Sequence, residues 1–246
     1  MLPTGSEAAA NLSPVDPLVF LTWENLTVIA KQTKRLLLQN VTGIAEPGQL
    51  IALMGASGAG KTTLLNALLQ RNVKGLKISG VVKINGHVVG RKITKVSAYI
   101  QQQNLFVNSL TVYEHLILQA ALRLPASFTK REKETRVKQV IHDLELEHCV
   151  SSRIGLCGLK SGITSGEAKR LAFATEILTN PSLLFADEPT TGIDSFMAYH
   201  IVKVLERMAS ENGKTIICTI HQPASDTFEM FDRVVFLANG RIAFLG

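Results

Sequence analysis

The sequence predicts an α/β protein built around a parallel β-sheet. Short apolar runs of strand type, at 50–54, 182–186 and 214–220, alternate with stretches of helical pattern. Strands that are apolar throughout are typical of parallel sheets, because helices cover both faces of such a sheet. A glycine-rich loop directly after the first run places a candidate site at the carboxyl ends of the strands, where these sheets bind ligands.

That loop reads GASGAGKTT over residues 55–63 and fits G-x-x-x-x-G-K-[ST], the pattern of a phosphate-binding loop. Glycine lets the backbone curl so that successive N–H groups converge on phosphate oxygens, while the positive end of the next helix faces the same anion. A glycine-rich turn with a chance lysine is the alternative, and the strand–loop–helix context disfavours it. We expect Lys61 to reach the β- and γ-phosphates and the Thr62 hydroxyl to hold Mg²⁺. The predicted nucleotide contacts are Gly55, Ala56, Ser57, Gly58, Ala59, Gly60, Lys61, Thr62 and Thr63.

Strand predictions rest on β-branched and aromatic runs and on two hairpin signals, Asn85-Gly86 and Asn239-Gly240. Trp23, in the first of these runs, either packs in the local sheet or stacks on an adenine base, and packing is favoured. The predicted strands are 18–29, 35–41, 50–54, 78–85, 87–89, 95–100, 182–186, 214–220, 233–237 and 241–245.

Helix predictions rest on apolar periodicity and on start signals such as Thr111 with Glu114 three residues later. Residues 164–167 open the helix at 168–178, which ends before Asn180-Pro181. The predicted helices are 61–70, 110–122, 129–146, 168–178, 195–210 and 225–231.

Polar residues follow several of the predicted strands. Asp187 and Glu188 end an apolar run, where a carboxylate pair is costly to bury unless a cation or a reaction needs it. We expect Asp187 to bind Mg²⁺ and Glu188 to activate a water molecule; a solvent-facing acidic pair is the alternative. Gln102 lies in a polar run that is either a plain loop or presents an amide to the metal ion or its water, and the second is favoured because a phosphate loop is present. An isolated histidine is more often structural, but His221 leaves a core strand at the same kind of place as Asp187, so a contact with the γ-phosphate is favoured.

Composition bounds the class of protein. The chain has 246 residues, of which 46% are hydrophobic and 19% charged, as in ordinary folded proteins. The net charge of +6 suits nucleotide binding or work near an anionic membrane surface, but it is not clustered enough to indicate a nucleic-acid partner. Cys149, Cys157 and Cys218 lack metal-ligand spacing and indicate reduced thiols, with Cys218 in the core. No run reaches 18 apolar residues, so we expect any membrane role to act through a partner or a further segment.

The order of motifs resembles the ATP-binding cassette (ABC) ATPases. The matching stretches are GASGAGKTT (55–63), YIQQQN (99–104), ITSGEAKR (163–170), LLFADEP (183–189), TTGIDS (190–195) and TIHQP (219–223). SLTVYEHL (109–116), DEPTTGIDSF (187–196) and the segment 219–242 are most similar to the G subfamily, the White/Brown eye-pigment and sterol half-transporter type.

The resemblance implies a P-loop NTPase with a RecA-like parallel-sheet core, an antiparallel β subdomain and a helical signature subdomain at about 105–165. Residues 18–246 would form the nucleotide-binding domain, and 1–17 a flexible tail. ATP with Mg²⁺ would be the cofactors. Glu188 would be the catalytic base, His221 the γ-phosphate switch and Gln102 a sensor of Mg²⁺ and the attacking water.

The resemblance also implies partners. Two cassettes, identical or different, would pair head to tail, so that Thr164, Ser165, Gly166 and Glu167 of one cap the ATP of the other, with Asp194 at the seam. A transmembrane domain, beyond residue 246 or in a separate chain, would export a lipophilic or small-molecule cargo, with the cassette on the cytoplasmic side of the membrane. A soluble cassette ATPase acting on nucleic acid is an alternative, but neither a long coiled-coil insertion nor a tandem cassette is present.

One departure bears on activity. The usual signature is Leu-Ser-Gly-Gly-Glu/Gln, and here Ser165 replaces the first glycine, while Thr164 keeps a hydroxyl for the γ-phosphate. A side chain at 165 would crowd a close backbone approach, so we hypothesise that the ATP site completed by this signature is weakened or non-hydrolytic. A regulatory partner that binds ATP without turnover is therefore the second alternative.

Overall fold

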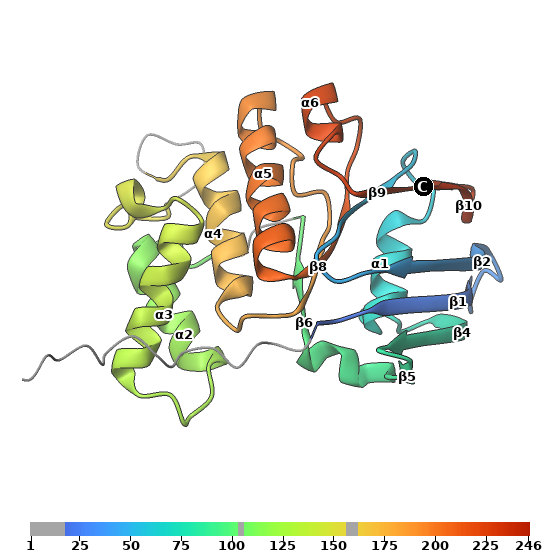
Figure 1. Cartoon of the computed structure of the whole chain (residues 1–246), viewed down its shortest axis with the longest axis horizontal. Coiled ribbons are helices and arrows are strands. Elements are labelled where there is room, and N and C mark those ends of the chain that lie inside the picture. Colours follow the sequence, from blue (N-terminus) through green and yellow to red (C-terminus); the bar gives the residue numbers. More distant parts are fainter. Residues whose placement is uncertain (1–17, 103–105, 156–161) are drawn as a thin grey trace, which may run out of the picture.

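The computed structural model describes residues 18–102, 106–155 and 162–246. The predicted tail at 1–17 and Cys157 lie outside these ranges. Helices pack on both sides of a central sheet, and a smaller sheet lies beside it (Figure 1). The strands are β1 (Leu21–Ala30), β2 (Leu36–Ala45), β3 (Leu50–Met54), β4 (Leu76–Ile84), β5 (His87–Val88), β6 (Ser97–Ile100), β7 (Leu183–Ala186), β8 (Thr215–Thr219), β9 (Arg233–Ala238) and β10 (Arg241–Leu245). The α-helices are α1 (Lys61–Leu69), α2 (Val112–Arg123), α3 (Lys130–Asp143), α4 (Ser165–Ile177), α5 (Ser195–Asn212) and α6 (Ser225–Phe228), joined by the 3₁₀ segments η1 (Gly90–Lys95) and η2 (Glu147–Cys149).

The central sheet has the order β10-β9-β3-β8-β7-β6. Its strands from β9 to β6 run parallel, and only β10 pairs antiparallel, through the predicted hairpin with β9. The predicted parallel core is therefore confirmed. Alternate residues of β3 face opposite layers, so that Leu50 and Ala52 join one hydrophobic core and Ile51 and Leu53 the other.

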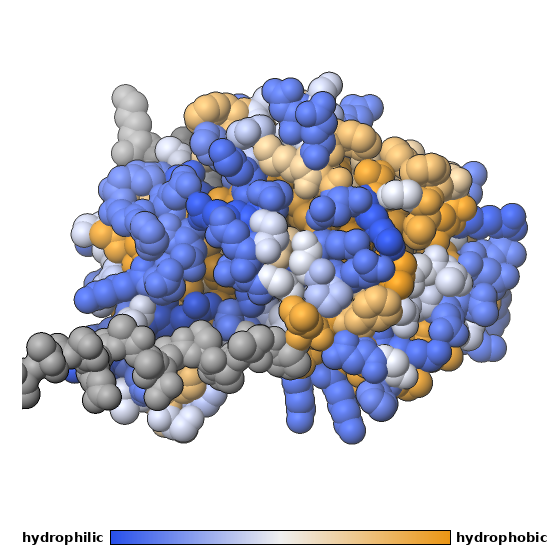
Figure 2. Space-filling view, viewed as in Figure 1, coloured by the Kyte–Doolittle hydropathy of each residue, from blue (hydrophilic) through white to orange (hydrophobic). Residues whose placement is uncertain are grey.

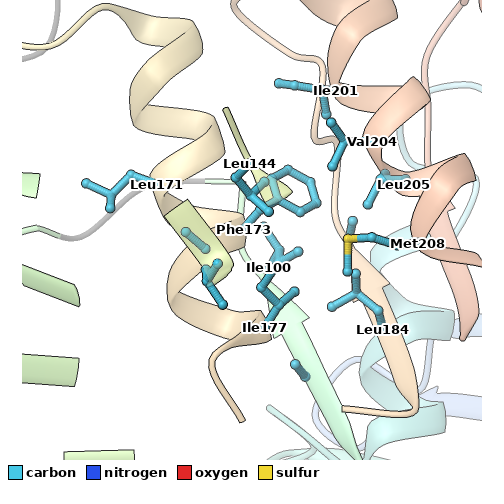
Figure 3. Close-up of a cluster of buried hydrophobic side chains, with 14 of the residues drawn as sticks. Ile100, Leu144, Leu171, Phe173, Ile177, Leu184, Ile201, Val204, Leu205 and Met208 are labelled. Carbon is cyan, nitrogen blue, oxygen red and sulfur yellow. The ribbon is translucent and has the colours of Figure 1, made fainter. Parts of the chain in front are cut away.

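The first core lies between the sheet and the helices α2 to α5. Figure 3 shows its centre, where Phe173 of α4 meets Ile100 of β6 and side chains of α5 approach from the opposite side. Phe173 is 1% exposed and Cys218 of β8 is fully buried in the same core, as predicted for Cys218. Burial raises the pKa of the Cys218 thiol to about 12, so it packs as a small neutral side chain.

The second core lies between the opposite face of the sheet, α1 and the antiparallel sheet β2-β1-β4-β5. Trp23 of β1 is 2% exposed there and pairs across the strands with Gly43 of β2. A Cβ at position 43 would overlap the indole ring, so Gly43 provides the space that the ring fills. Trp23 is thus a core residue, as favoured, and is not exposed to an adenine base.

Element ends follow local chemistry. Asn85 (φ 49°) and Gly86 (φ 80°) form the first predicted hairpin turn, and Thr111 and Glu114 form the predicted capping box of α2. The helix expected at 129–146 ends earlier, at Asp143, because Glu145 adopts a left-handed conformation (φ 53°) and reverses the chain into η2. The segment η1, which was not predicted, delays β6 to Ser97.

Hydrophilic residues cover the face of α2 and α3, and more hydrophobic ones gather near β9 and β10 (Figure 2). Phe244 and Leu245 of β10 are among these exposed apolar residues. Among the described residues, no helix combines the length and the hydrophobicity that a membrane crossing requires.

The pairing of Trp23 with Gly43 gives a stability prediction. We expect Gly43→Ala to lower the free energy of unfolding by about 1–3 kcal/mol, because the new methyl group overlaps the buried ring. Urea unfolding of the purified chain measures this. Ser79→Ala, at an exposed position of β4 in the same sheet, should change it by less than about 0.5 kcal/mol. Equal stability of Gly43→Ala and the parent would contradict the packing account.

Candidate functional site

The glycine-rich loop lies between β3 and α1 and is held by its neighbours. A Cβ at Gly55 (φ 149°) would overlap the Leu237 carbonyl oxygen of β9, and Gly58 has a left-handed φ of 79°. The backbone N–H of Gly240 donates to the Ala59 oxygen at 3.0 Å, which ties the loop to the β9–β10 turn. Gly60 gives α1 no side-chain cap, so the first amides of this helix remain available to an anion.

Lys61 lies across the loop to which it belongs. Its side chain is nearly buried, with the residue 6% exposed. Its Nζ donates to the carbonyl oxygens of Gly55 at 2.8 Å and Ala56 at 3.2 Å. The ammonium group is therefore held over the cradle that the glycines form, where it would meet a bound phosphate.

Asp187 is the point at which distant segments converge. It follows β7, is 6% exposed, and accepts hydrogen bonds from Thr62 Oγ1 at 3.1 Å, Tyr99 Oη at 2.9 Å and Thr219 Oγ1 at 2.8 Å. Thr62 was predicted and the structure brings it to Asp187. Sequence reasoning missed Tyr99 and Thr219, whose only signal is their place at or next to the last residues of β6 and β8.

Tyr99 stays a hydrogen-bond donor in this setting. Burial is the largest cause that raises the pKa of its hydroxyl above the ordinary value, and the Asp187 carboxylate adds to the effect. The hydroxyl therefore keeps its proton and donates a hydrogen bond to Asp187 Oδ2.

Glu188 points its carboxylate toward Gln102. Gln102 Nε2 donates to Glu188 Oε2 at 2.8 Å, and Thr191 Oγ1 donates to the same oxygen at 3.0 Å. Glu188 itself has a left-handed φ of 49°, and its N–H donates to Thr219 Oγ1 at 2.7 Å. An unfavourable backbone conformation held by these bonds is typical of a functional residue. The structure thus brings together Gln102 and Glu188; Thr191 was not among the predicted site residues.

His221 is exposed just after β8. The preceding residue, Ile220, donates its N–H to the Leu53 oxygen at 3.2 Å, next to the start of the glycine-rich loop. His221 therefore leaves the sheet at the same edge as the loop.

The signature residues lie elsewhere in the chain. Thr164 is the N-cap of α4 and forms a capping box with Glu167, and its hydroxyl donates to Glu167 Oε2 at 2.8 Å. Burial raises the pKa of Glu167, but hydrogen bonds from the Thr164 backbone, the Thr164 hydroxyl and His148 outweigh it and lower that pKa below its usual value. In Figure 1, α5 lies between the start of α4 and the start of α1, so these residues do not meet the glycine-rich loop of their own chain.

Two further predicted residues sit at the contact between α4 and α5. Asp194 caps α5 and accepts from the Met197 N–H at 3.0 Å. A Cβ at Gly166 would overlap the end of the Met197 side chain, so a larger residue at 166 would require Met197 to move. Ser165, by contrast, is exposed. Lys169 Nζ donates to the backbone carbonyl oxygen of Gln102 at 2.7 Å, which couples α4 to the segment that carries Gln102.

The glycine-rich loop, Lys61 and Thr62 lie at one sheet edge with Asp187 and Glu188, which is the arrangement of a P-loop nucleotide-binding site. Residues 38–191 match the family model described as ABC transporter.

Several of the similar curated proteins are named as ABC transporters. The chain is 47% identical over 244 residues to the ABC transporter ATP-binding protein/permease wht-3 of Caenorhabditis elegans, covering 97% of this chain and 39% of that protein. It is 52% identical over 213 residues to Protein white of Drosophila melanogaster, covering 85% and 31%. It is 42% identical over 233 residues to ABC transporter G family member 13 of Arabidopsis thaliana, covering 93% and 34%.

Solved structures support the fold. cbiO1 from Clostridium perfringens, described as part of the ABC transporter complex cbiONQ, superposes with a TM-score of 0.79 at 24% identity, covering 92% of this chain and 87% of that one. A dimeric ATP-binding cassette in a post-hydrolysis state, bound to ADP and Pi, gives a TM-score of 0.74 at 22% identity, covering 92% and 97%. The predicted P-loop NTPase fold, with antiparallel and helical parts, is confirmed.

The chain therefore belongs to the ABC transporter family, as a nucleotide-binding cassette of the G-subfamily type. It spans roughly a third of the length of the curated relatives it matches, for example 39% of wht-3 and 31% of white.

The Asp187 cluster gives a prediction. We expect Tyr99→Phe to lower the free energy of unfolding by about 1–3 kcal/mol, because a buried carboxylate loses one of its three hydroxyl donors. Urea unfolding measures the change. Tyr113→Phe removes a hydroxyl from a half-buried tyrosine of α2 and should lower the same free energy by less than about 1 kcal/mol. Equal losses in the two variants would contradict the special role of the hydroxyl of Tyr99.

Proposed function

We propose that the chain is the ATP-hydrolysing motor of a membrane exporter. The observation that carries this is the convergence of Thr62, Asp187 and the Gln102–Glu188 pair at one sheet edge, beside the glycine-rich cradle. The predicted nucleotide contacts, Gly55 to Thr63, would hold the phosphates with backbone N–H groups and the Lys61 ammonium. The known role of ABC cassettes supports ATP over other nucleotides.

Mg²⁺ fits the residues present. Thr62 offers a hydroxyl, Asp187 a carboxylate and Gln102 an amide oxygen, which are the oxygen ligands that Mg²⁺ prefers. When bound, the ion would neutralise charge that develops on the β- and γ-phosphate oxygens.

Glu188 would act as the general base. Gln102 and Thr191 hold its Oε2, which would keep the carboxylate in place to accept a proton from the attacking water. The water oxygen forms the new bond to phosphorus, Glu188 takes the water proton, and ADP leaves. His221, at the neighbouring strand end, would contact the γ-phosphate.

Two cassettes would share each ATP. Within one chain the signature residues Thr164 to Glu167 lie apart from the glycine-rich loop, so a second cassette, identical or different, has to supply them. Asp194 would lie at the seam between the two. Closure on ATP and reopening after hydrolysis would drive transport through a transmembrane domain, in the same polypeptide or in another chain.

The relatives support a proposal for the placement and the cargo. The word permease in the name of wht-3, together with the length of that protein not covered by this chain, supports a membrane domain next to a cassette on the cytoplasmic side. A lipophilic or small-molecule cargo is the corresponding proposal, and nothing in the chain favours a nucleic-acid partner.

Hydrolysis is tested with Glu188→Gln. We expect this change to reduce ATP turnover by about 10²-fold or more, because the general base is lost, while ATP binding is kept and the ATP-bound dimer becomes more stable. Phosphate release, nucleotide binding and size-exclusion chromatography measure the three effects. Glu211→Gln, near the exposed end of α5, is the matched control and should leave all three unchanged. Turnover that survives Glu188→Gln would refute the assignment of the base.

A regulatory role without turnover is the second candidate, and Ser165 favours it. If the side chain crowds the partner's ATP, Ser165→Gly should raise the ATPase rate of the assembled transporter, and Ser165→Ala, which keeps the Cβ, should raise it much less. Steady-state phosphate release compares the three proteins. An unchanged rate for Ser165→Gly would show that the serine does not limit hydrolysis.

A further inference from the structure

A second cluster of potential ligand side chains lies on the helical side of the molecule, where η2 meets the start of α4. It consists of His148, Cys149 and Glu167, and His148 Nε2 lies 2.7 Å from Glu167 Oε1. One ligand atom from each side chain lies within 4.8 Å of those of the other two. Across residues 18–102, 106–155 and 162–246, no other group of three His, Cys, Asp or Glu side chains meets this condition.

The cluster is buried on one side and exposed to solvent on the other. Cys149 is 3% exposed and forms the buried back of the cluster. The His148 side chain is 59% exposed and gives access from solvent, whereas that of Glu167 is 14% exposed. Backbone bonds from Cys149 to Leu146, at 3.1 Å, and from Ser152 to Cys149, at 2.9 Å, fix the turn that presents His148 and Cys149 together.

The donor set selects a class of ion. A thiolate, an imidazole and a carboxylate suit zinc and related transition metals, whereas Mg²⁺ and Ca²⁺ prefer oxygen ligands alone. Zinc-type bond lengths place neighbouring ligands of a tetrahedron about 3.3–3.8 Å apart. The contact of 2.7 Å between His148 and Glu167 would therefore open by about 0.6–1 Å, which two side chains at a partly exposed site can accommodate.

We propose that His148, Cys149 and Glu167 bind one zinc-class metal ion, with solvent in the fourth position. On binding, the Cys149 S–H bond is replaced by a sulfur–metal bond and its proton is released to solvent, with no change of oxidation state. The neutral His148 ring keeps its proton on Nδ1 and presents Nε2 to the ion, so the shared ion replaces the hydrogen bond to Glu167.

The ion would connect η2 to the first turn of α4. Glu167 Oε2 already accepts from the Thr164 N–H at 2.7 Å and from the Thr164 hydroxyl at 2.8 Å. Binding through Oε1 leaves this capping box intact and joins it to the turn of His148 and Cys149. An occupied site therefore stabilises residues 164–167 in the arrangement seen here. The inference does not depend on nucleotide, so it stands or falls apart from ATP hydrolysis.

The experiment uses the full chain, treated with a chelator and then titrated with Co²⁺ as a spectroscopic probe and with Zn²⁺ in competition. Cys157→Ser serves as the background, so that Cys149 and the fully buried Cys218 are the remaining thiols. We expect a cobalt–thiolate absorption band at one ion per chain, displaced by Zn²⁺, and a rise in melting temperature with Zn²⁺.

Three variants in that background decide the assignment. Cys149→Ser should abolish the thiolate band, and His148→Asn, at an exposed side chain, should weaken binding by about 100-fold or more, since outer-shell partners alone are worth 10–100-fold. The control is His142→Asn, which alters a His–Glu pair of 2.8 Å with Glu147 and should bind Co²⁺ like the parent. Absence of the thiolate band in the parent, or equal affinities of His148→Asn and His142→Asn, would overturn the proposal.

Discussion

The structure depends on one buried carboxylate. Asp187 sits at the end of β7, where an isolated charge would be costly, and three hydroxyl groups from β6, α1 and β8 compensate for its burial. These bonds fix the carboxyl ends of three parallel strands relative to α1 and its loop. Because Thr219 also accepts the Glu188 N–H, the position of the proposed base follows from the same cluster. The same hydrogen bonds to Asp187 thus both order the site and stabilise the sheet edge.

The glycine-rich loop and the signature turn, residues 164–167, lie on either side of α5 (Figure 1). The glycine-rich loop belongs to the core shared by α1 and the antiparallel sheet, whereas the signature turn belongs to the helical side. Met197, on the first turn of α5, contacts the space left by Gly166 and also donates its N–H to Asp194. Lys169 links α4 to the backbone of Gln102. A displacement of residues 164–167 would therefore act on Asp194 through Met197. It would also act on Gln102, whose side chain donates to Glu188.

Residues with a strong local signal were predictable from sequence. Several elements lie where their sequence patterns place them: the glycine-rich loop, the apolar strands before it and before Asp187, and both Asn-Gly turns. Local backbone conformation and burial determine the structure at these positions. Tyr99 and Thr219 were missed because a hydroxyl at or near a strand end carries no signal until the strand order is known. Thr191 was missed because it lies in the turn after β7, and its contact with Glu188 depends on how that turn folds. The same holds for Met197, whose contact with Gly166 joins residues of two helices. The early end of α3 was missed because Glu145 takes a left-handed conformation for which glutamate has no preference.

The departure from the usual signature is best understood from what each position does within its own chain. At 166 a Cβ would meet the end of the Met197 side chain, so a larger residue would displace that side chain, and the chain keeps glycine. At 165 the side chain is exposed, so the fold of the cassette itself imposes no such limit and tolerates serine. Any constraint at 165 has to come from outside the chain, from a nucleotide or a second cassette. The Thr164 hydroxyl already has a role within its own chain, because it donates to Glu167 Oε2 in the capping box. To donate to a phosphate it would have to give up that hydrogen bond. The local stability of the α4 start and the proposed contact with a partner's ATP would therefore compete for the same few atoms.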